Sequence, residues 1–273
     1  MSPETDEVEA LRVAVTEAGA LVMRYFRQDP KTWDKPGEGP VSEADLAAND
    51  LLRERLAGAF PDHGWLSEES ADDETRLSRS RVWIVDPIDG TRAFVAGKPE
   101  FTVCAALVVE GEAVAGVVFN PAKEELFLAA KGQGATRNGV LLPVIPPPPF
   151  VEAQTISTRG VLKPWRWQGD PPGGRHGYVN SLAYRACKVA TDRWDVAIVL
   201  KRLSEWDLAA AQIVVEEAGG RVTTRAGDPI RYNAPDPKIA GLIAAADPLH
   251  AEVVRRLLPE DEAIARRDGL AEG

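Results

Sequence analysis

The chain has 273 residues, of which 44% are hydrophobic and 27% charged, a composition that excludes a disordered or fibrous protein. Its 42 acidic and 32 basic side chains give a net charge of −10, which argues against a nucleic-acid polymer as partner. Cys104 and Cys187 lie in apolar segments and are expected to be buried free thiols in a reducing compartment. The acidic N-terminus lacks the pattern of a signal peptide, and no apolar segment approaches the ~18 residues needed to span a membrane. We therefore expect a cytoplasmic protein without a membrane partner.

The chain begins with two predicted helices. Apolar residues recur at helical spacing over residues 5–27 and 41–60. Ser42, followed three residues later by Asp45, is typical of the start of a helix. Residues 28–40 between the two helices are rich in proline, glycine and charge, so we expect a loop there.

Strands follow the second helix. A short apolar segment at 64–70 and the apolar run 82–85 predict two of them, and the β-branched and alternating segments between 100 and 139 predict an antiparallel meander. Four consecutive prolines, Pro146 to Pro149, favour an extended segment and cannot lie inside a helix or a central strand. We take them as the boundary between a first subdomain of residues 1–145 and a second of residues 150–273.

The second half mixes strands with helices, so we expect an α/β or α+β fold with layered packing. Residues 159–177 are predicted to form a loop. The expected strands are 153–158, 195–200 and 239–246, and the expected helices are 181–191, 204–220 and 247–258.

Acidic residues stand at the ends of several predicted elements. Glu68 and Glu69 follow one strand, Asp86 and Asp89 follow the next, and Asp207 lies at a helix start. Ordinary explanations exist for most of them: solvated loop acids, an Asp-Gly turn at Asp89, and support of a helix N-terminus by Asp207. Asp86 is harder to explain, because it directly follows four apolar residues and a buried carboxylate is costly unless it is paired or holds a metal.

The spacing of Asp86 and Asp89 favours a cation between them. Pro87 fixes the backbone so that both carboxylates can face one point, and they repel unless one is protonated or a cation intervenes. The candidate ligands are hard oxygen donors without a nearby His or Cys, which selects Mg²⁺, Mn²⁺ or Ca²⁺ over Zn²⁺. The amides of Gly90 and Thr91 would add an anion site beside the metal, and the Thr91 hydroxyl could orient a water.

Three segments in the same order and spacing resemble the signatures of the inositol monophosphatase superfamily. They are DPIDGT at 86–91, SEES at 67–70, and EWDLAA with EEAGG between 205 and 220. The similarity extends from the first helix to about residue 246. The resemblance implies a Mg²⁺-dependent, lithium-sensitive phosphomonoesterase that acts on a small-molecule phosphate ester. It also implies the five-layered αβαβα sandwich of the inositol monophosphatase and fructose-1,6-bisphosphatase type, often as a homodimer.

The same resemblance implies a role for each motif residue. The metal ligands would be Glu68, Asp86, the carbonyl of Ile88, Asp89 and Asp207. Asp86 would bridge two Mg²⁺ ions. A third, more weakly bound ion would contact Glu68 through water molecules, and Mn²⁺ could replace Mg²⁺. Thr91, paired with Asp45, would activate the water, and the amides of Gly90 and Thr91 would hold the phosphate.

Weaker features indicate the substrate. DGTRAF at 89–94, KPEFTVCAALV at 98–108 and EWDLAA resemble the 3'(2'),5'-bisphosphate nucleotidases, which remove the 3'-phosphate of phosphoadenosine phosphate. Inositol monophosphatases carry a glutamate for the inositol hydroxyls near the position of Val199 and Leu200, and an apolar pair cannot bind a diol. An inositol or other polyol phosphate, histidinol phosphate, and an inactive homologue that only binds metal or ligand remain alternatives.

Substrate contacts are predicted from Ser181, Arg185 and Lys201, with Arg202 as an alternative to Lys201. Two features near the predicted helix 181–191 depart from the family pattern. Asn180-Ser181 stands where the family has Gly-Ser before this helix, and the nucleotidases carry a lysine near Arg185 in a helix that is one residue shorter. The substrate side of the site therefore departs from the pattern. The predicted loop 159–177 contains tryptophans and arginines, and could be a lid over adenine or a variable loop whose aromatics pack on the core.

Overall fold

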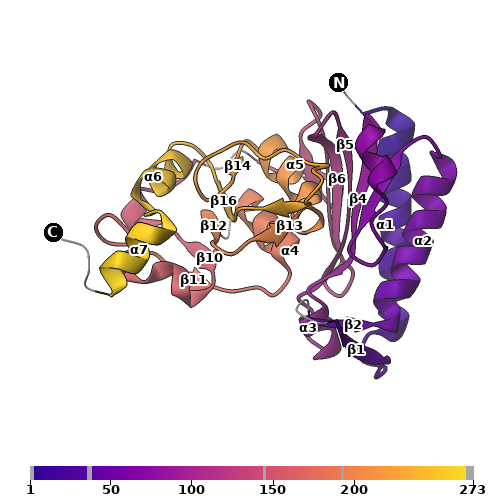
Figure 1. The fold of residues 1–273 in the computed structure, drawn as a ribbon, viewed down its shortest axis with the longest axis horizontal. Helices are drawn as coiled ribbons and strands as arrows, with labels where there is room; N and C mark the ends of the chain where they lie inside the picture. The colour runs from indigo at the N-terminus through magenta and orange to yellow at the C-terminus, as the bar shows by residue number, and fades with distance from the viewer. Residues whose placement is uncertain (1–2, 36–38, 144–145, 192–193, 269–273) are drawn as a thin grey trace.

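The computed structural model describes residues 3–35, 39–143, 146–191 and 194–268. Two long helices, a seven-stranded sheet, a pair of short helices, a five-stranded sheet and two C-terminal helices are stacked in that order (Figure 1). These five layers confirm the predicted αβαβα sandwich. In chain order the helices are α1 (Thr5–Tyr25), α2 (Glu43–Ala59), α3 (Thr91–Val95), α4 (Leu182–Cys187), α5 (Ala209–Glu217), α6 (Leu249–Arg256) and α7 (Glu260–Arg267).

The first sheet has its strands in sequence order, and after one parallel pair every neighbour is antiparallel. The predicted meander is therefore confirmed. Its strands are β3 (Gly64–Ser67), β4 (Arg81–Asp89), β5 (Thr102–Val109), β6 (Glu112–Asn120), β7 (Glu125–Ala130), β8 (Ala135–Arg137) and β9 (Val140–Leu141).

The second sheet is mixed, with the spatial order β11-β10-β12-β16-β14. Two further strand pairs, β1 with β2 and β13 with β15, lie outside both sheets. The strands of the second sheet are β10 (Thr155–Ser157), β11 (His176–Gly177), β12 (Val196–Val199), β14 (Arg221–Thr223) and β16 (Leu242–Ala245). The separate pairs are β1 (Thr32–Lys35) with β2 (Gly39–Ser42), and β13 (Leu203–Ser204) with β15 (Lys238–Ile239).

Strand β4 carries its side chains alternately into two different apolar cores. Trp83 and Val85 pack in the core beneath α1 and α2, whereas Val82 and Ile84 pack in the core between the two sheets. Because successive side chains of a strand point to opposite faces, Asp86 follows Ile84 onto the face that looks toward the second half of the chain.

A β-bulge then changes the direction of the Asp89 side chain. Asp86 pairs with Cys104 and Asp89 with Thr102, so three steps along β4 are matched by two along β5. In a regular strand Asp86 and Asp89 would face opposite ways, and the extra residue brings Asp89 onto the face of Asp86. Thus the two carboxylates lie in the last part of a bulged strand, and not in a turn after it.

Several local predictions differ from the structure. The predicted helix 204–220 is not continuous, because Ser204 ends β13, Glu205–Asp207 form a 3₁₀ turn and α5 begins at Ala209. Residues 28–40 are not only a loop, because β1 and β2 form a hairpin there; residues 36–38 lie outside the described part. Helix α7 was not predicted, since its short sequence is mostly charged. The segment 159–177 is not all loop, because it contains 3₁₀ turns at Arg159–Leu162 and Pro164–Arg166 and the short strand β11.

The predicted boundary around the prolines lies between the two sheets in sequence. The last described strand before it is β9 and the first after it is β10, while residues 144 and 145 lie outside the described part. Within the described residues, none of the helices has the length and apolar character needed to cross a membrane.

Two glycines provide a stability test of the contact between β6 and α5. A Cβ on Gly116 would lie 2.6 Å from the Ala210 carbonyl and 2.7 Å from Ile213, whereas a Cβ on Gly58, in α2, would meet nothing within 4 Å. We expect Gly116→Ala to lower the free energy of unfolding by about 1–3 kcal/mol through overpacking. The matched Gly58→Ala should raise it by about 0.4–1 kcal/mol. Urea unfolding would measure both, and equal effects would contradict the close packing described.

Candidate active site

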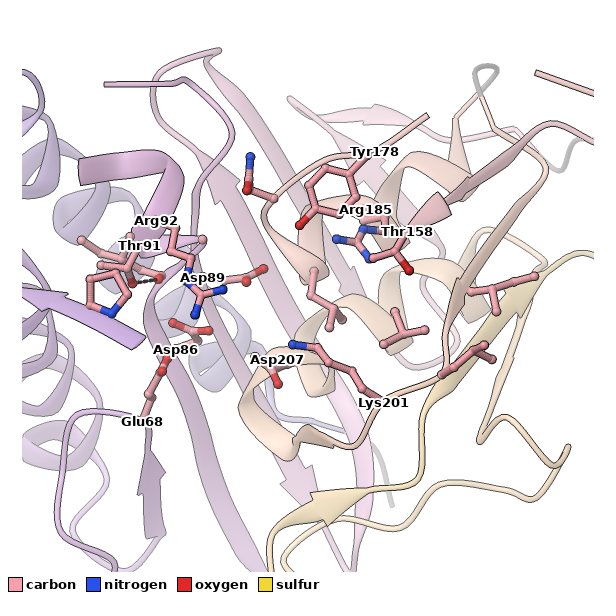
Figure 2. Close-up of a pocket in the computed structure, with 18 residues that line it drawn as sticks. Glu68, Asp86, Asp89, Thr91, Arg92, Thr158, Tyr178, Arg185, Lys201 and Asp207 are labelled. Atoms are coloured by element: carbon pink, nitrogen blue, oxygen red, sulfur yellow. Dashed lines mark hydrogen bonds between the residues drawn. The ribbon is translucent and has the colours of Figure 1, made fainter. Parts of the chain in front are cut away.

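The acidic residues line a cavity of about 470 Å³ between the end of β4 and the second half of the chain. Figure 2 shows Glu68, Asp86 and Asp89 on one side of it and Asp207 across from them. The four side chains come from three places: Glu68 follows β3, the two aspartates lie at the end of β4, and Asp207 lies in the 3₁₀ turn η6 (Glu205–Asp207). The cavity therefore exists only when both halves of the chain are folded together.

Three of these carboxylates are close enough to share a cation. Asp86, Asp89 and Asp207 offer oxygens that all lie within 4.8 Å of one another. Asp86 is 1% exposed, and neither of its oxygens has a hydrogen-bond partner among the described residues. Burial, together with the carboxylates of Glu68 and Asp89, raises its pKa well above the usual value. A buried carboxylate with both oxygens unpartnered fits a metal ligand, and the all-oxygen donor set suits Mg²⁺ or Mn²⁺.

The other two aspartates are held from the second half of the chain. The Ser181 hydroxyl and the Ala183 amide both donate to Asp89 Oδ2, each at 2.6 Å, at the start of α4. The Ser204 amide donates to Asp207 Oδ2 at 2.7 Å. These bonds fix one oxygen of each carboxylate. Burial and the nearby Asp89 raise the pKa of Asp207 to about 6.

Glu68 lies at the edge of the cluster. It lines the main cavity and also an adjoining cavity of about 320 Å³, but it is not one of the three carboxylates that approach within 4.8 Å. Burial, followed by the charge of Asp207, raises the pKa of Glu68 to about 8. Lys35, from the hairpin, donates to the Glu68 carbonyl and pairs with Glu69 at 2.5 Å. Glu69 is therefore held by an ion pair.

Thr91 and Asp45 lie together, as the resemblance implied. The Thr91 hydroxyl is 3.0 Å from Asp45 Oδ1 and 3.0 Å from the Ile88 carbonyl oxygen. Asp45 also accepts the Ser42 amide and hydroxyl at 2.8 and 2.6 Å, which confirms the predicted helix start at Ser42. Burial raises the pKa of the Asp45 carboxyl to about 6 despite these bonds.

Gly90 occupies a position that no other residue would fill easily. Its φ is +96°, and a Cβ would lie 2.9 Å from the Glu100 carbonyl and 3.2 Å from the Ser181 amide nitrogen. The first bonds of helix α3 run from the amides of Ala93 and Phe94 to the Gly90 carbonyl. Hence the amides of Gly90 and Thr91 precede the hydrogen-bonded part of the helix.

The predicted substrate residues are placed differently from one another. Arg185 and Lys201 both line the cavity, opposite Thr91 (Figure 2). Ser181 is fully buried and does not line it; its hydroxyl caps α4 and contacts Asp89 and Thr102. This placement gives Ser181 a positioning contact with a candidate metal ligand.

The tryptophans of the segment 159–177 were expected either to form a lid over adenine or to pack on the core. Trp167 is buried in the outermost apolar core, its ring NH bonded to the Val161 carbonyl, and Trp165 lies under the Arg166 guanidinium. Neither tryptophan lines the cavity. Core packing therefore accounts for Trp167, and the lid interpretation has no support from these rings.

Several residues that line the cavity were not predicted from the sequence, among them Arg92, Thr158 and Tyr178. Arg92 extends into it from α3, and Thr158 and Tyr178 approach from the second half (Figure 2). Arg92 directly follows the DPIDGT segment, so its proximity was a usable signal. Thr158 and Tyr178 stand at the two ends of the segment 159–177, and no local pattern shows that both return to the same cavity.

Comparison with known proteins places the chain in a family. A model of the inositol monophosphatase family matches residues 4–260. The chain is 36% identical to a histidinol-phosphatase of Chlorobaculum parvum, over 79% of this chain and 85% of the relative. It is 33% identical to inositol monophosphatase 2 of Solanum lycopersicum, over 78% of this chain and 85% of that relative. A solved IMPase structure from Thermotoga maritima covers 98% of this chain and 100% of its own, with a TM-score of 0.82 and 27% identity.

The chain therefore belongs to the inositol monophosphatase family, and it is a phosphomonoester hydrolase. The family is metal-dependent, in agreement with the buried cluster of Asp86, Asp89 and Asp207.

Asp86 provides a test of the metal site. We expect Asp86→Asn to raise the melting temperature of the chelator-treated protein at pH 8, because it removes a buried carboxyl that is costly to ionise and has no partner among the described residues. The same substitution should abolish stabilisation by Mg²⁺. A carboxyl whose pKa is raised by folding keeps its proton to higher pH when folded than when unfolded. The metal-free wild type should thus lose stability as the pH rises above the ordinary carboxyl pKa values of 3.8 and 4.5. The loss should continue to about pH 6 for Asp207 and to about pH 8 for Glu68, and the effect of Mg²⁺ should grow over the same range.

Thermal unfolding with EDTA or with Mg²⁺ would measure these shifts. Asp62→Asn is the matched control, because the Asp62 side chain is 97% exposed and should leave the Mg²⁺ response unchanged. A full Mg²⁺ response in Asp86→Asn would contradict the assignment of the metal site.

Proposed function

We propose that the chain is a Mg²⁺-dependent phosphatase whose substrate is a nucleoside 3',5'-bisphosphate such as phosphoadenosine phosphate. The observation that carries the catalytic part is the pair of unpartnered Asp86 oxygens beside the Thr91–Asp45 hydrogen bond. The residues that would hold two or three Mg²⁺ ions, or Mn²⁺, are Glu68, Asp86, the Ile88 carbonyl, Asp89 and Asp207. When bound, such ions supply positive charge to the phosphoryl group and lower the pKa of water.

Thr91 and Asp45 are suited to accept a proton from the attacking water. When the Thr91 hydroxyl donates to Asp45 Oδ1, its own lone pairs remain available to a water in the cavity. The pKa of Asp45 is about 6, so at pH 7 it is mainly a carboxylate and can take the hydroxyl proton. Asp45 does not itself line the cavity, so Thr91 provides the contact with water.

The phosphate would lie between this pair and the cations. The amides of Gly90 and Thr91, which precede the hydrogen-bonded turns of α3, would donate to phosphate oxygens. Arg92 lines the same part of the cavity and would add positive charge. Electrostatic stabilisation of this kind supplies most of the rate in phosphoryl transfer.

Thr91 can be tested by a pair of substitutions. Thr91→Val removes the hydroxyl while keeping the shape, and should lower kcat by about 100-fold or more, the size expected for losing an acid–base group. Thr91→Ser keeps the hydroxyl and should stay within about tenfold of the wild type. Phosphate release under saturating substrate and Mg²⁺ would measure both, and equal activity of the two variants would contradict the proposed role.

The charges on the far side of the cavity favour an anionic leaving group. Beyond the four metal-side carboxylates, the charged lining residues are the cations Arg92, Arg185 and Lys201. A second phosphate would be attracted to Arg185 and Lys201, whereas the ammonium group of histidinol would be repelled. Val199 and Leu200 offer no acceptor side chain to the hydroxyls of an inositol.

Histidinol phosphate is the second candidate, because a relative at 36% identity is named a histidinol-phosphatase. Inositol phosphate has comparable support from a named relative at 33% identity, but not from the cavity lining. A homologue without activity is disfavoured, since the metal-site acids and the Thr91–Asp45 pair are all present.

A substrate panel with Mg²⁺ separates these candidates. We expect kcat/KM to be highest for phosphoadenosine phosphate, compared with histidinol phosphate, inositol 1-phosphate and fructose 1,6-bisphosphate. Lys201→Met should raise KM for the bisphosphate by roughly tenfold, the order of magnitude of one charge-assisted contact. Arg202→Met is the matched control, because Arg202 is an exposed cation paired with Asp236 at 2.7 Å. Preferred turnover of histidinol phosphate would overturn the choice of substrate.

A further inference from the structure

Tyr178 is the one aromatic side chain among the residues lining the cavity in the described part of the chain. It lies between β11 and α4, on the side of the cavity away from Asp86 (Figure 2). The residue is 50% exposed, so part of its ring surface is open. The phosphate chemistry described above makes no use of this ring.

Arg185 holds the ring from one side. Its guanidinium carbon lies 4.7 Å from the centroid of the Tyr178 ring, and Arg185 itself is only 5% exposed. The guanidinium is fixed in turn, because Nε and Nη2 both donate to the Val179 carbonyl, at 3.1 and 2.6 Å. A ring stacked on a buried, doubly bonded guanidinium is held in one orientation before any ligand arrives.

Apolar residues also line the cavity. They are Leu182 at the start of α4, Ile198 and Val199 of β12, and Leu200, which directly follows β12. An apolar wall beside an aromatic ring suits a flat, largely apolar group and offers little to a polyol, whose hydroxyls would lose hydrogen bonds to water there. The cavity therefore combines cationic side chains with apolar and aromatic ones.

We infer that Tyr178 is a stacking platform for the nucleobase of the leaving group, held in place by Arg185. The base would lie against the open surface of the Tyr178 ring, with the apolar wall beside it. Stacking on an aromatic ring tolerates any base, so Tyr178 would favour nucleotides as a class over base-free sugar phosphates. This inference rests on the proposed function for the identity of the leaving group, but it can be tested by binding alone.

The test compares adenosine 5'-phosphate with ribose 5-phosphate, which lacks the base, by calorimetric titration of the Mg²⁺-loaded protein. The wild type should bind the nucleotide about tenfold or more tightly than the sugar phosphate, the order of magnitude of one base–aromatic stack. Tyr178→Phe keeps the ring and should keep this preference. Tyr178→Ala should reduce the ratio of the two dissociation constants to about twofold or less. Melting temperatures would show that each variant is folded.

The outcomes separate this inference from the proposed function. Equal binding of both ligands by the wild type, or an undiminished preference in Tyr178→Ala, would overturn the stacking role. A preference that Tyr178→Ala removes supports it, even if phosphoadenosine phosphate is not turned over, in which case the nucleotidase proposal alone fails.

Discussion

The site depends on one irregularity of the backbone, the β-bulge between Asp86 and Asp89. Side chains alternate along a strand, so two residues three positions apart belong on opposite faces of a sheet. The extra residue, which lies between the pairs Asp86–Cys104 and Asp89–Thr102, cancels this alternation and turns both carboxylates toward the second half of the chain. Ile88, between them, stays in the core beneath α1 and α2. The same strand thus remains anchored in the core while it concentrates negative charge at its end.

That concentration of charge requires support from elements far away in sequence. Asp89 receives a hydroxyl and an amide from the start of α4, and Asp207 receives the Ser204 amide. A buried hydrogen-bond network also fixes η6. Glu205 accepts hydrogen bonds from the amides of Asn233 and Ala234. Arg76 donates to the side-chain oxygen of Asn233 and to the carbonyl of Ala234. Neither oxygen of Asp86 has a hydrogen-bond partner among the residues that the structure describes. The fold thus leaves this carboxylate free to bind a cation.

Local chemistry made part of this arrangement predictable from sequence. The Ser42–Asp45 helix start and the burial of Asp86 follow from short-range patterns, and both are present in the structure. The five-layer fold came from the family resemblance, which short-range patterns alone would not have supplied. The β1–β2 hairpin escaped prediction because proline, glycine and charge masked its short strands. The bulge and the burial of Ser181 depend on which residue of another strand or helix lies opposite, and no local pattern encodes that pairing.

The residues at the substrate end of the cavity are harder to predict from the sequence, for a related physical reason. Binding a divalent cation demands oxygen donors at fixed geometry, so these residues occur in short segments of recognisable spacing. Holding a leaving group demands only a shape and a distribution of charge, which many side chains can supply from unrelated places. Arg92, Thr158, Tyr178 and Lys201 accordingly come from four separate segments. In this chain, apolar and cationic side chains line the same cavity, so a leaving group with a flat apolar part and an anionic part would satisfy both at once.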